Sequence, residues 1–334
     1  MEDKKNISKK MILYALISCA LCAMLIAVFH ELNVIHEIRN EDNKDIPVYK
    51  AKYAFVSSDD EDELVKAVYD AAFNYGAQRD IYVEDFGALR TGNYSIEELL
   101  QMAVYSAPDG IILCGDNDEE INDVINQAVD KGIPVVTCVS DREQSKRQCY
   151  VGSNYYTMGM EYAKALEELV DSDDDTCLLM VPETLSTVSR NTLITTIMGE
   201  LASKNRNIVL DVQPVDTSDN FVVEEKVRDL ILDSNASPDV VICLNPNITS
   251  TMYRMLVDYN RVGDISVIGY YNSESILKGI YKKVIYSSVT VDAVAIGENS
   301  VKAVSEYIDT GFVSDYIPVD VERIDGDNVE KYLN

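Results

Sequence analysis

The chain has 334 residues, 47% of them hydrophobic, so it is long and apolar enough to form one large or two ordinary domains with substantial cores. Acidic residues outnumber basic ones 57 to 29, and the formal charge of −28 would repel a phosphate backbone over most of the surface. Composition therefore argues against general disorder and against nucleic acid as a partner.

The first strong feature is an apolar segment at residues 11–29, which has 19 residues and no charge. A helix of that length crosses about 30 Å of hydrocarbon, so the segment predicts a transmembrane anchor or an export signal. Lysines precede it and few basic residues follow, which keeps residues 1–10 in the cytoplasm and places the rest outside. A buried core helix is the alternative, but such helices seldom run this long without a polar face.

Cleavage of this segment depends on residues 16–19, LISC, which resemble a bacterial lipoprotein box. The residues after Cys19 stay apolar, whereas a mature lipoprotein normally continues into polar sequence. We therefore expect an uncleaved anchor in preference to lipidation of Cys19. The expected location is the cell membrane, with a single span and the C-terminal domain outside the cytoplasm.

Residues 30–46 are charged and only weakly periodic, and they predict a stalk. Beyond Pro47, short β-branched runs alternate with helical patterns, and the pair Ser95 and Glu98 forms a capping box at one helix start. The nearly continuous apolar strands predict a parallel sheet with helices on both faces. This first series consists of strands at 53–57, 80–84, 109–114 and 135–139 and helices at 61–75, 96–105 and 119–130.

The alternation then starts again. Two similar α/β halves, each built on a doubly wound parallel sheet, are the simplest account. In doubly wound sheets a ligand binds beyond the carboxyl ends of the strands, and two facing halves form a cleft there. This second series consists of helices at 154–169, 191–203, 222–232, 249–260 and 273–280 and strands at 177–181, 208–212, 240–244, 265–269 and 284–289.

The residues at those strand ends are the candidates for ligand binding. They carry hydroxyls, amides, carboxylates and arginine, a set that suits a neutral polyhydroxylated or a zwitterionic ligand. Solvated loops are polar in any case, so each single residue could equally be polar for that reason. The candidates are Asp59, Asp60, Asp116, Asp141, Arg142, Arg190, Asn245 and Tyr271.

The cysteines beyond the apolar segment are odd in number and have no CxxC spacing. Most of them lie inside apolar runs that read as strands, where a cysteine behaves as a small buried hydrophobe. We therefore expect no disulfide framework. The five residues are Cys114, Cys138, Cys149, Cys177 and Cys243.

Several motifs follow one another between residues 109 and 159: DGIIL, then GIPVV, then an SD…SKR stretch, then YVGSNYYTMG. In this order they resemble the first lobe of the type I periplasmic binding proteins, the ribose- and galactose-binding group whose fold the LacI-type repressors share. Weaker similarity covers residues 48–334. The resemblance implies two lobes, joined by three crossovers, that close over a small ligand. Lobe 1 would comprise 47–153 with 292–311, and lobe 2 would comprise 154–291 with 312–334.

The resemblance also implies roles for some of the candidates. Arg190 and Asn245 fall where the second lobe of the family offers an Arg and an Asn to sugar hydroxyls. Asp141 and Arg142 lie beside the polar pair of the first lobe.

Other positions depart from the family's pattern. The family's pocket Asp at the end of the fourth strand aligns with Val139, so Asp141 comes two residues late. The second-lobe Asp aligns with Tyr271, although Tyr270 or Tyr271 could supply a stacking surface for a sugar. The fold match is thus better than the pocket match, which weakens a monosaccharide as ligand without weakening a solute-binding cleft.

An enzyme is the first alternative class. The only histidines, His30 and His36, both follow closely after the apolar segment, so no Ser-His-Asp or Cys-His arrangement is available in the folded part. Their spacing differs from that of a zinc-protease motif, and no glycine motif that would cradle a phosphate is present. We therefore expect no catalytic residue, no metal and no cofactor. A repressor would need a DNA-binding unit before Pro47, where the apolar segment lies instead.

The expected function is that of a membrane-tethered solute-binding protein outside the cytoplasm. It would capture a small polar ligand, a sugar or a sugar-like molecule, by hinge closure and deliver it to an ABC-type importer. The alternative is a ligand-sensing ectodomain that signals to a partner kinase or receptor. The expected partners are the solute, the membrane through the N-terminal helix, and an ABC permease or a sensor kinase.

Overall fold

The computed structural model describes residues 49–57, 62–87, 94–115, 121–170, 175–206, 208–232 and 238–333. The expected tail, apolar span and stalk lie outside these ranges, as do the candidates Asp59, Asp60 and Asp116. None of the helices in the described ranges combines the length and the hydropathy that a membrane crossing requires. Residues Lys50–Asn334 form one compact unit, which is described below.

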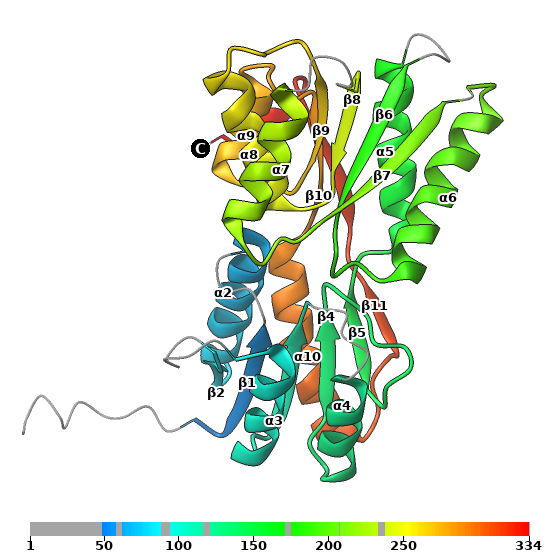
Figure 1. The fold of residues 1–334 in the computed structure, drawn as a ribbon. Coiled ribbons are helices and arrows are strands. Elements are labelled where there is room, and N and C mark those ends of the chain that lie inside the picture. The colour runs from blue at the N-terminus through cyan, green and yellow to red at the C-terminus, as the bar shows by residue number, and fades with distance from the viewer. Residues whose placement is uncertain are drawn as a thin grey trace, which may run out of the picture. The chain divides into compact units, whose positions relative to one another are not determined.

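Two six-stranded sheets organise this unit (Figure 1). The strands of the first sheet are all parallel, and this sheet with the helices packed on it is called the first lobe. Its order is β11 (Tyr316–Pro318), β5 (Cys149–Gly152), β4 (Val135–Cys138), β3 (Gly110–Cys114), β1 (Ala51–Ser57) and β2 (Ile81–Asp85).

The second sheet and its helices form the second lobe. Its strands are parallel except β12, which runs antiparallel to β10. The expected class, α/β with two parallel-dominated sheets, is therefore confirmed. The order is β12 (Val321–Asp325), β10 (Ser287–Val291), β9 (Ser266–Tyr270), β8 (Val240–Cys243), β6 (Thr176–Pro182) and β7 (Val209–Val215).

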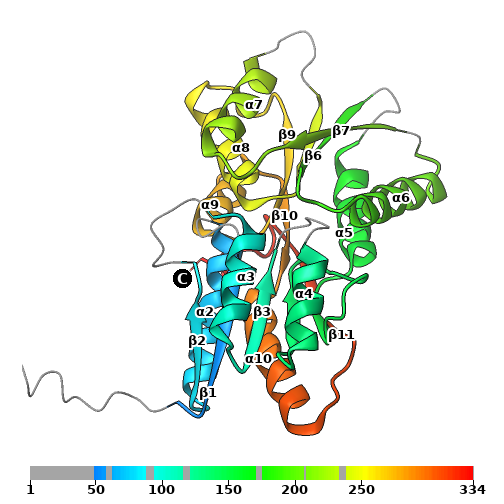
Figure 2. The ribbon, with the colours of Figure 1, turned by 60° about the horizontal axis from the view of Figure 1, so that its bottom comes forward.

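In the first lobe, helices cover both faces of the sheet, which explains its apolar strands. Every residue of β3 is buried. Ile112 faces a core shared with α2 (Glu63–Ala77) and α10 (Ala293–Thr310). Its neighbours Ile111 and Leu113 face a second core, shared with α3 (Ile96–Ser106) and α4 (Ile121–Asp130). Figure 2 shows α3 and α4 in front of this sheet.

In the second lobe, α5 (Tyr155–Leu169) packs on β9, β10 and β12 and against α6 (Thr187–Ser203). The other helices are α7 (Asn220–Leu232), α8 (Pro246–Asp258) and α9 (Glu274–Tyr281), with a short 3-10 turn, η1, at Val329–Lys331. They lie on the opposite side of the sheet from α5 and α6 (Figure 1). Both lobes are thus sheets between helical layers, which leaves the strand ends as the open positions.

Every strand and helix expected beyond Pro47 overlaps an observed element, and the capping box of Ser95 and Glu98 is confirmed. Three helices, α6, α7 and α8, begin earlier than expected, and an N-cap residue accounts for the earlier start of two of them. Ser186 caps α6, and Asn245 caps α8, where Pro occupies the first turn. Both signals are typical of helix starts.

The chain passes between the sheets three times in the described ranges: from β5 to α5, from β10 to α10, and from β11 to β12. The C-terminal segment differs from the expected division. Residues 312–334 were assigned to lobe 2, but β11 pairs with β5 in the first sheet, and β12 alone joins the second. The third crossover therefore lies between Pro318 and Val321.

Candidate functional site

Strands from both sheets end at a shared cavity between the lobes, which is called the cleft cavity. Its volume is about 220 Å³. Ligand pockets for drug-sized molecules usually measure ~300–1,000 Å³, so this one suits a small solute. It is lined by Asp62, Leu64, Val65, Cys114, Gly115, Val139, Ser140, Tyr155, Met158, Pro182, Thr184, Leu185, Thr217, Ser218, Leu244, Asn245, Pro246 and Tyr270.

Two helix N-caps meet across the cleft cavity. In the first lobe, Oδ1 of Asp62 accepts hydrogen bonds from the backbone N–H groups of Leu64 (2.8 Å) and Val65 (3.1 Å) and so caps α2. In the second lobe, Asn245 caps α8 through its own Oδ1 and donates from Nδ2 to Oδ2 of Asp62 over 3.4 Å. The amino end of a helix stabilises a carboxylate, so Asp62 is a favourable cap at this point of contact between the lobes.

The remainder of the lining is aromatic, hydroxylic and apolar. Burial raises the pKa of Tyr155 to about 12, against a hydrogen bond to Ser189 that lowers it, and burial raises that of Tyr270 well above its usual value. Both phenols therefore stay protonated and able to donate at neutral pH. Among the described lining residues none is Lys, Arg or His, and Asp62 carries the single carboxylate. The cavity thus suits a neutral ligand with an apolar face.

The backbone is strained beside the cleft cavity. Val139, which follows β4, has φ 68°, and Tyr271, which follows β9, has φ 75°. Positive φ is a marked outlier for a β-branched or bulky residue, and such strain concentrates at functional sites. Both residues occur where the family pattern would place a carboxylate, so the structure gives these positions a conformational role.

The structure brings only some of the expected ligand-binding residues to the cleft cavity. Asn245 lines it. Tyr271 does not, although its neighbour Tyr270 does. Burial, followed by the charges of Asp62 and Glu63, raises the pKa of Tyr271 to about 12, which places its phenol near the start of α2. Arg190 lies half-buried on α6 and lines neither the cleft cavity nor the second cavity described next.

Asp141 belongs to that second cavity, which is called the crossover cavity and has a volume of about 530 Å³. Tyr155, at the first crossover, lines both cavities. The crossover cavity is more charged than the cleft cavity, because acidic side chains and one Arg converge on it. It is lined by Asp141, Glu143, Ser145, Arg147, Tyr150, Ser153, Asn154, Tyr155, Val188, Ser189, Thr192, Asp315 and Tyr316.

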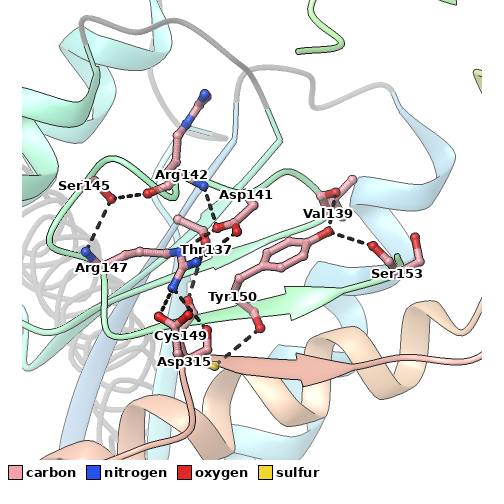
Figure 3. A network of polar contacts seen from close by, with 10 residues as sticks. All are labelled: Thr137, Val139, Asp141, Arg142, Ser145, Arg147, Cys149, Tyr150, Ser153 and Asp315. Carbon is pink, nitrogen blue, oxygen red and sulfur yellow. Dashed lines mark hydrogen bonds and ion pairs between the residues drawn. The ribbon is translucent and has the colours of Figure 1, made fainter. Parts of the chain in front are cut away.

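Asp141 is bound to Arg147 (Figure 3). The guanidinium donates from Nε to Oδ1 (2.5 Å) and from Nη2 to Oδ2 (2.9 Å) of Asp141, and from Nη1 to Oδ1 of Asp315 (2.7 Å). The side chain of Arg147 is only 5% exposed. Burial lowers the pKa of Arg147, but the bonds and charges of Asp141 and Asp315 outweigh it and raise the pKa above its usual value. Such a bidentate pair holds a loop in place.

A tyrosine links this loop to the crossover. The hydroxyl of Tyr150 donates to the backbone carbonyls of Val139 (3.1 Å) and Ser153 (3.3 Å), and its ring stacks on Tyr316 at 5.6 Å. Arg142 is buried, and its backbone N–H donates to Oδ1 of Asp141 (2.6 Å). In Figure 3 the Arg142 side chain points away from the Asp141–Arg147 pair, and it lines neither cavity.

Asp62 is the site residue that the sequence reasoning missed. The helix there was expected to start at residue 61, which put Asp62 inside its first turn. An Asp directly before a helical apolar pattern is an N-cap signal that could have found it. Within the described ranges, no group of three or more His, Cys, Asp or Glu is arranged to hold a metal ion.

Comparisons with known proteins agree with this geometry. A family model described as "Periplasmic binding protein domain" matches residues 54–311. No curated protein matches the sequence. Solved structures with 17–21% identity share the fold.

The first of these structures is GanP, a glucose-galactose binding protein from Geobacillus stearothermophilus, with 19% identity, a TM-score of 0.71, and coverage of 83% of this chain and 98% of that one. Another is an ABC transporter solute binding protein from Burkholderia graminis C4D1M in complex with D-arabinose, with 17% identity, a TM-score of 0.73, and coverage of 85% and 98%. A third is the XylFII-LytSN complex, with 19% identity, a TM-score of 0.69, and coverage of 83% and 98%.

Proposed function

Since the chain belongs to the periplasmic binding protein domain family, we propose that it captures a small neutral solute, a sugar or a sugar-like molecule, in the cleft cavity for an ABC-type importer. The observation that carries this proposal is the cavity itself. It lies at the strand ends of both sheets, and the Asp62–Asn245 contact crosses it.

The chemistry of the lining supports a sugar. A carboxylate, an amide and phenol hydroxyls offer acceptors and donors to ligand hydroxyls, and tyrosine rings offer a stacking surface. Two similar structures are a glucose-galactose binding protein and a solute binding protein in complex with D-arabinose, which supports the same ligand class.

The proposed mechanism is hinge closure about the three crossovers. A solute that contacts Asp62 in the first lobe and Asn245 and Tyr270 in the second stabilises the closed form by the difference between its affinities for the two forms. Asp59, Asp60 and Asp116 remain predicted ligand contacts.

We further propose that the apolar segment at 11–29 tethers the protein to the membrane as a single span, with the lobes outside the cytoplasm. A second candidate function is sensing, in which the closed form is recognised by a partner kinase or receptor. The solved XylFII-LytSN complex supports this second function, because in it a protein of this fold is in complex with a second protein.

The test is a thermal-shift screen of the full chain in detergent against sugars, polyols, amino acids and nucleosides. We expect a sugar or polyol to raise the melting temperature at millimolar concentration, since ligands that bind only the folded state stabilise it. A shift with amino acids or nucleosides alone would refute the sugar, and no shift with any class would refute solute capture.

A further inference from the structure

Two cysteines lie side by side at the ends of neighbouring strands next to the cleft cavity, and Cys114 lines that cavity. Cys114 is the last residue of β3 and Cys138 the last of β4, and they are register partners in this parallel pair. Neighbouring strands lie about 4.8 Å apart, and register partners project to the same face. Both cysteines face the core shared with α2 and α10, and their thiols are hydrogen-bonded to each other.

This pair has the spacing that a disulfide requires. Bridged cysteines have Cα atoms ~4.4–6.8 Å apart, and adjacent strands in register fall within that range. The strand ends are also tied together beyond the pair, because the backbone N–H of Gly115 donates to the carbonyl of Cys138 over 3.1 Å. All five described cysteines carry free thiols in the structure.

The other described cysteines lack such a partner. Cys149 on β5 is the register partner of Val136, so it lies diagonally from Cys138, at roughly 7–8 Å. Cys177 and Cys243 sit three positions out of register on β6 and β8. The Cys114–Cys138 pair is therefore distinct among the described cysteines.

Cys114 also has a route to small reagents, because it lines the cleft cavity. We propose that Cys114 and Cys138 are an oxidation site, at which a small disulfide compound that enters the cleft cavity converts the two thiols into a cross-strand disulfide. An exported chain meets oxidants of this class outside the cytoplasm.

The reaction is two thiol–disulfide exchanges. The Cys114 thiolate attacks one sulfur of the small disulfide, whose S–S bond breaks and releases one thiolate. The Cys138 thiolate then attacks the Cys114 sulfur of the mixed disulfide and releases the second. The protein loses two electrons and two protons, and the reagent is reduced to two thiols.

Burial makes this exchange slow at neutral pH. The hydrogen bond that the Cys114 thiol donates to Cys138, together with burial, holds the pKa of Cys114 well above its usual range. Since the thiolate is the nucleophile, the rate should rise with pH. A disulfide would then draw the ends of β3 and β4 together beneath the solute, which links the oxidation state to the proposed binding site.

The experiment treats the reduced full chain in detergent with 2-hydroxyethyl disulfide at pH 7 and pH 9, without solute, and maps peptides under non-reducing conditions. We expect a peptide pair linked through Cys114 and Cys138 that forms faster at pH 9. Cys149→Ser should leave that linkage intact, whereas Cys138→Ser should trap Cys114 as a mixed disulfide with the reagent.

Two results would overturn the proposal: recovery of both cysteines as free thiols after prolonged treatment at pH 9, or linkage of Cys138 to Cys149 with equal yield. Because no solute is present, these results are independent of whether a sugar binds. If no sugar bound, the Cys114–Cys138 linkage would still be expected to form.

Discussion

The cleft cavity and the crossover cavity share a wall at Tyr155 but differ in chemistry. The cleft cavity is small and largely apolar, with one carboxylate held at a helix start. The crossover cavity is larger and charged, and its central Arg147 is bound on two sides by Asp141 and Asp315. A largely buried guanidinium that already has two carboxylate partners holds structure and has little left to offer a ligand. The crossover cavity, although more polar, is therefore the weaker candidate for solute binding.

Val139 explains why Asp141 is in the crossover cavity. The strand before it ends at the cleft, but Val139 has φ 68°, and its carbonyl accepts from Tyr150. After this turn the chain leads to the Asp141–Arg147 pair (Figure 3). The end of a strand therefore sets the position of the backbone at the cleft. The conformation of the residues that follow determines which cavity their side chains line.

The largest expected effect is a loss of stability from a substitution in the crossover cavity. Arg147→Met removes both hydrogen bonds of the guanidinium to Asp141, and at about 1.5 kcal/mol for each charged bond the loss should lower the free energy of unfolding by about 3 kcal/mol. Urea denaturation measures this. Lys146→Met is the matched control, because Lys146 pairs with Asp130 on the surface and should cost under ~1 kcal/mol. Equal losses in the two variants would show that the bidentate Asp141–Arg147 pair stabilises the fold no more than a surface ion pair does.

The second prediction is a loss of solute affinity from a substitution in the cleft cavity. Asn245→Asp preserves the cap of α8, since Asp caps helices as well as Asn. It replaces the donor to Asp62 by a second carboxylate, so we expect solute affinity to fall by about 2 kcal/mol, roughly 30-fold. Calorimetric titration with the solute found by thermal shift measures it. Asn247→Asp is the control, because it adds the same charge two residues further along, at a position that does not line the cleft cavity. Comparable weakening in this variant would point to a general charge effect.

A smaller effect separates two adjacent tyrosines. Tyr270 lines the cleft cavity and Tyr271 does not. Tyr270→Phe should weaken solute binding by about 1 kcal/mol, roughly fivefold, through loss of one hydrogen bond, and Tyr271→Phe should leave affinity unchanged. The same titration distinguishes them. The reverse order of effects would assign the contact to Tyr271, as the family pattern implied.

The smallest effect concerns the wall that the cavities share. The pKa of Tyr155 is about 12 in the fold, above the usual Tyr value of about 10, so its contribution to stability is complete below pH ~10 and is lost as pH rises towards 12. Tyr155→Phe should therefore make the fall of the unfolding free energy with pH less steep in that window, by the equivalent of up to one bound proton. Tyr156→Phe, at an exposed neighbour, should not change the slope. Identical slopes in all three proteins would mean that Tyr155 titrates normally.

The sequence predicted most of the fold because buried strands and amphipathic helices leave periodic patterns. It missed β5, since CYVG is short and follows a polar loop, and it placed β11 in the wrong lobe, since no local pattern shows which sheet a short strand joins. The site was harder. Asn245 reached the cleft cavity, but a backbone turn at Val139 and an ion pair with Arg147 decided the position of Asp141. Those are tertiary contacts that strand-end position does not encode.

On the proposed function, solute binds in the cleft cavity and not in the crossover cavity. The most direct test is calorimetric titration of one solute into Asn245→Asp and Asp141→Asn. Asp141→Asn alters the crossover cavity without touching the cleft lining. We predict affinity within about twofold of the unsubstituted chain for Asp141→Asn and roughly 30-fold weaker binding for Asn245→Asp. Lost affinity in Asp141→Asn together with unchanged affinity in Asn245→Asp would show that the solute binds in the crossover cavity.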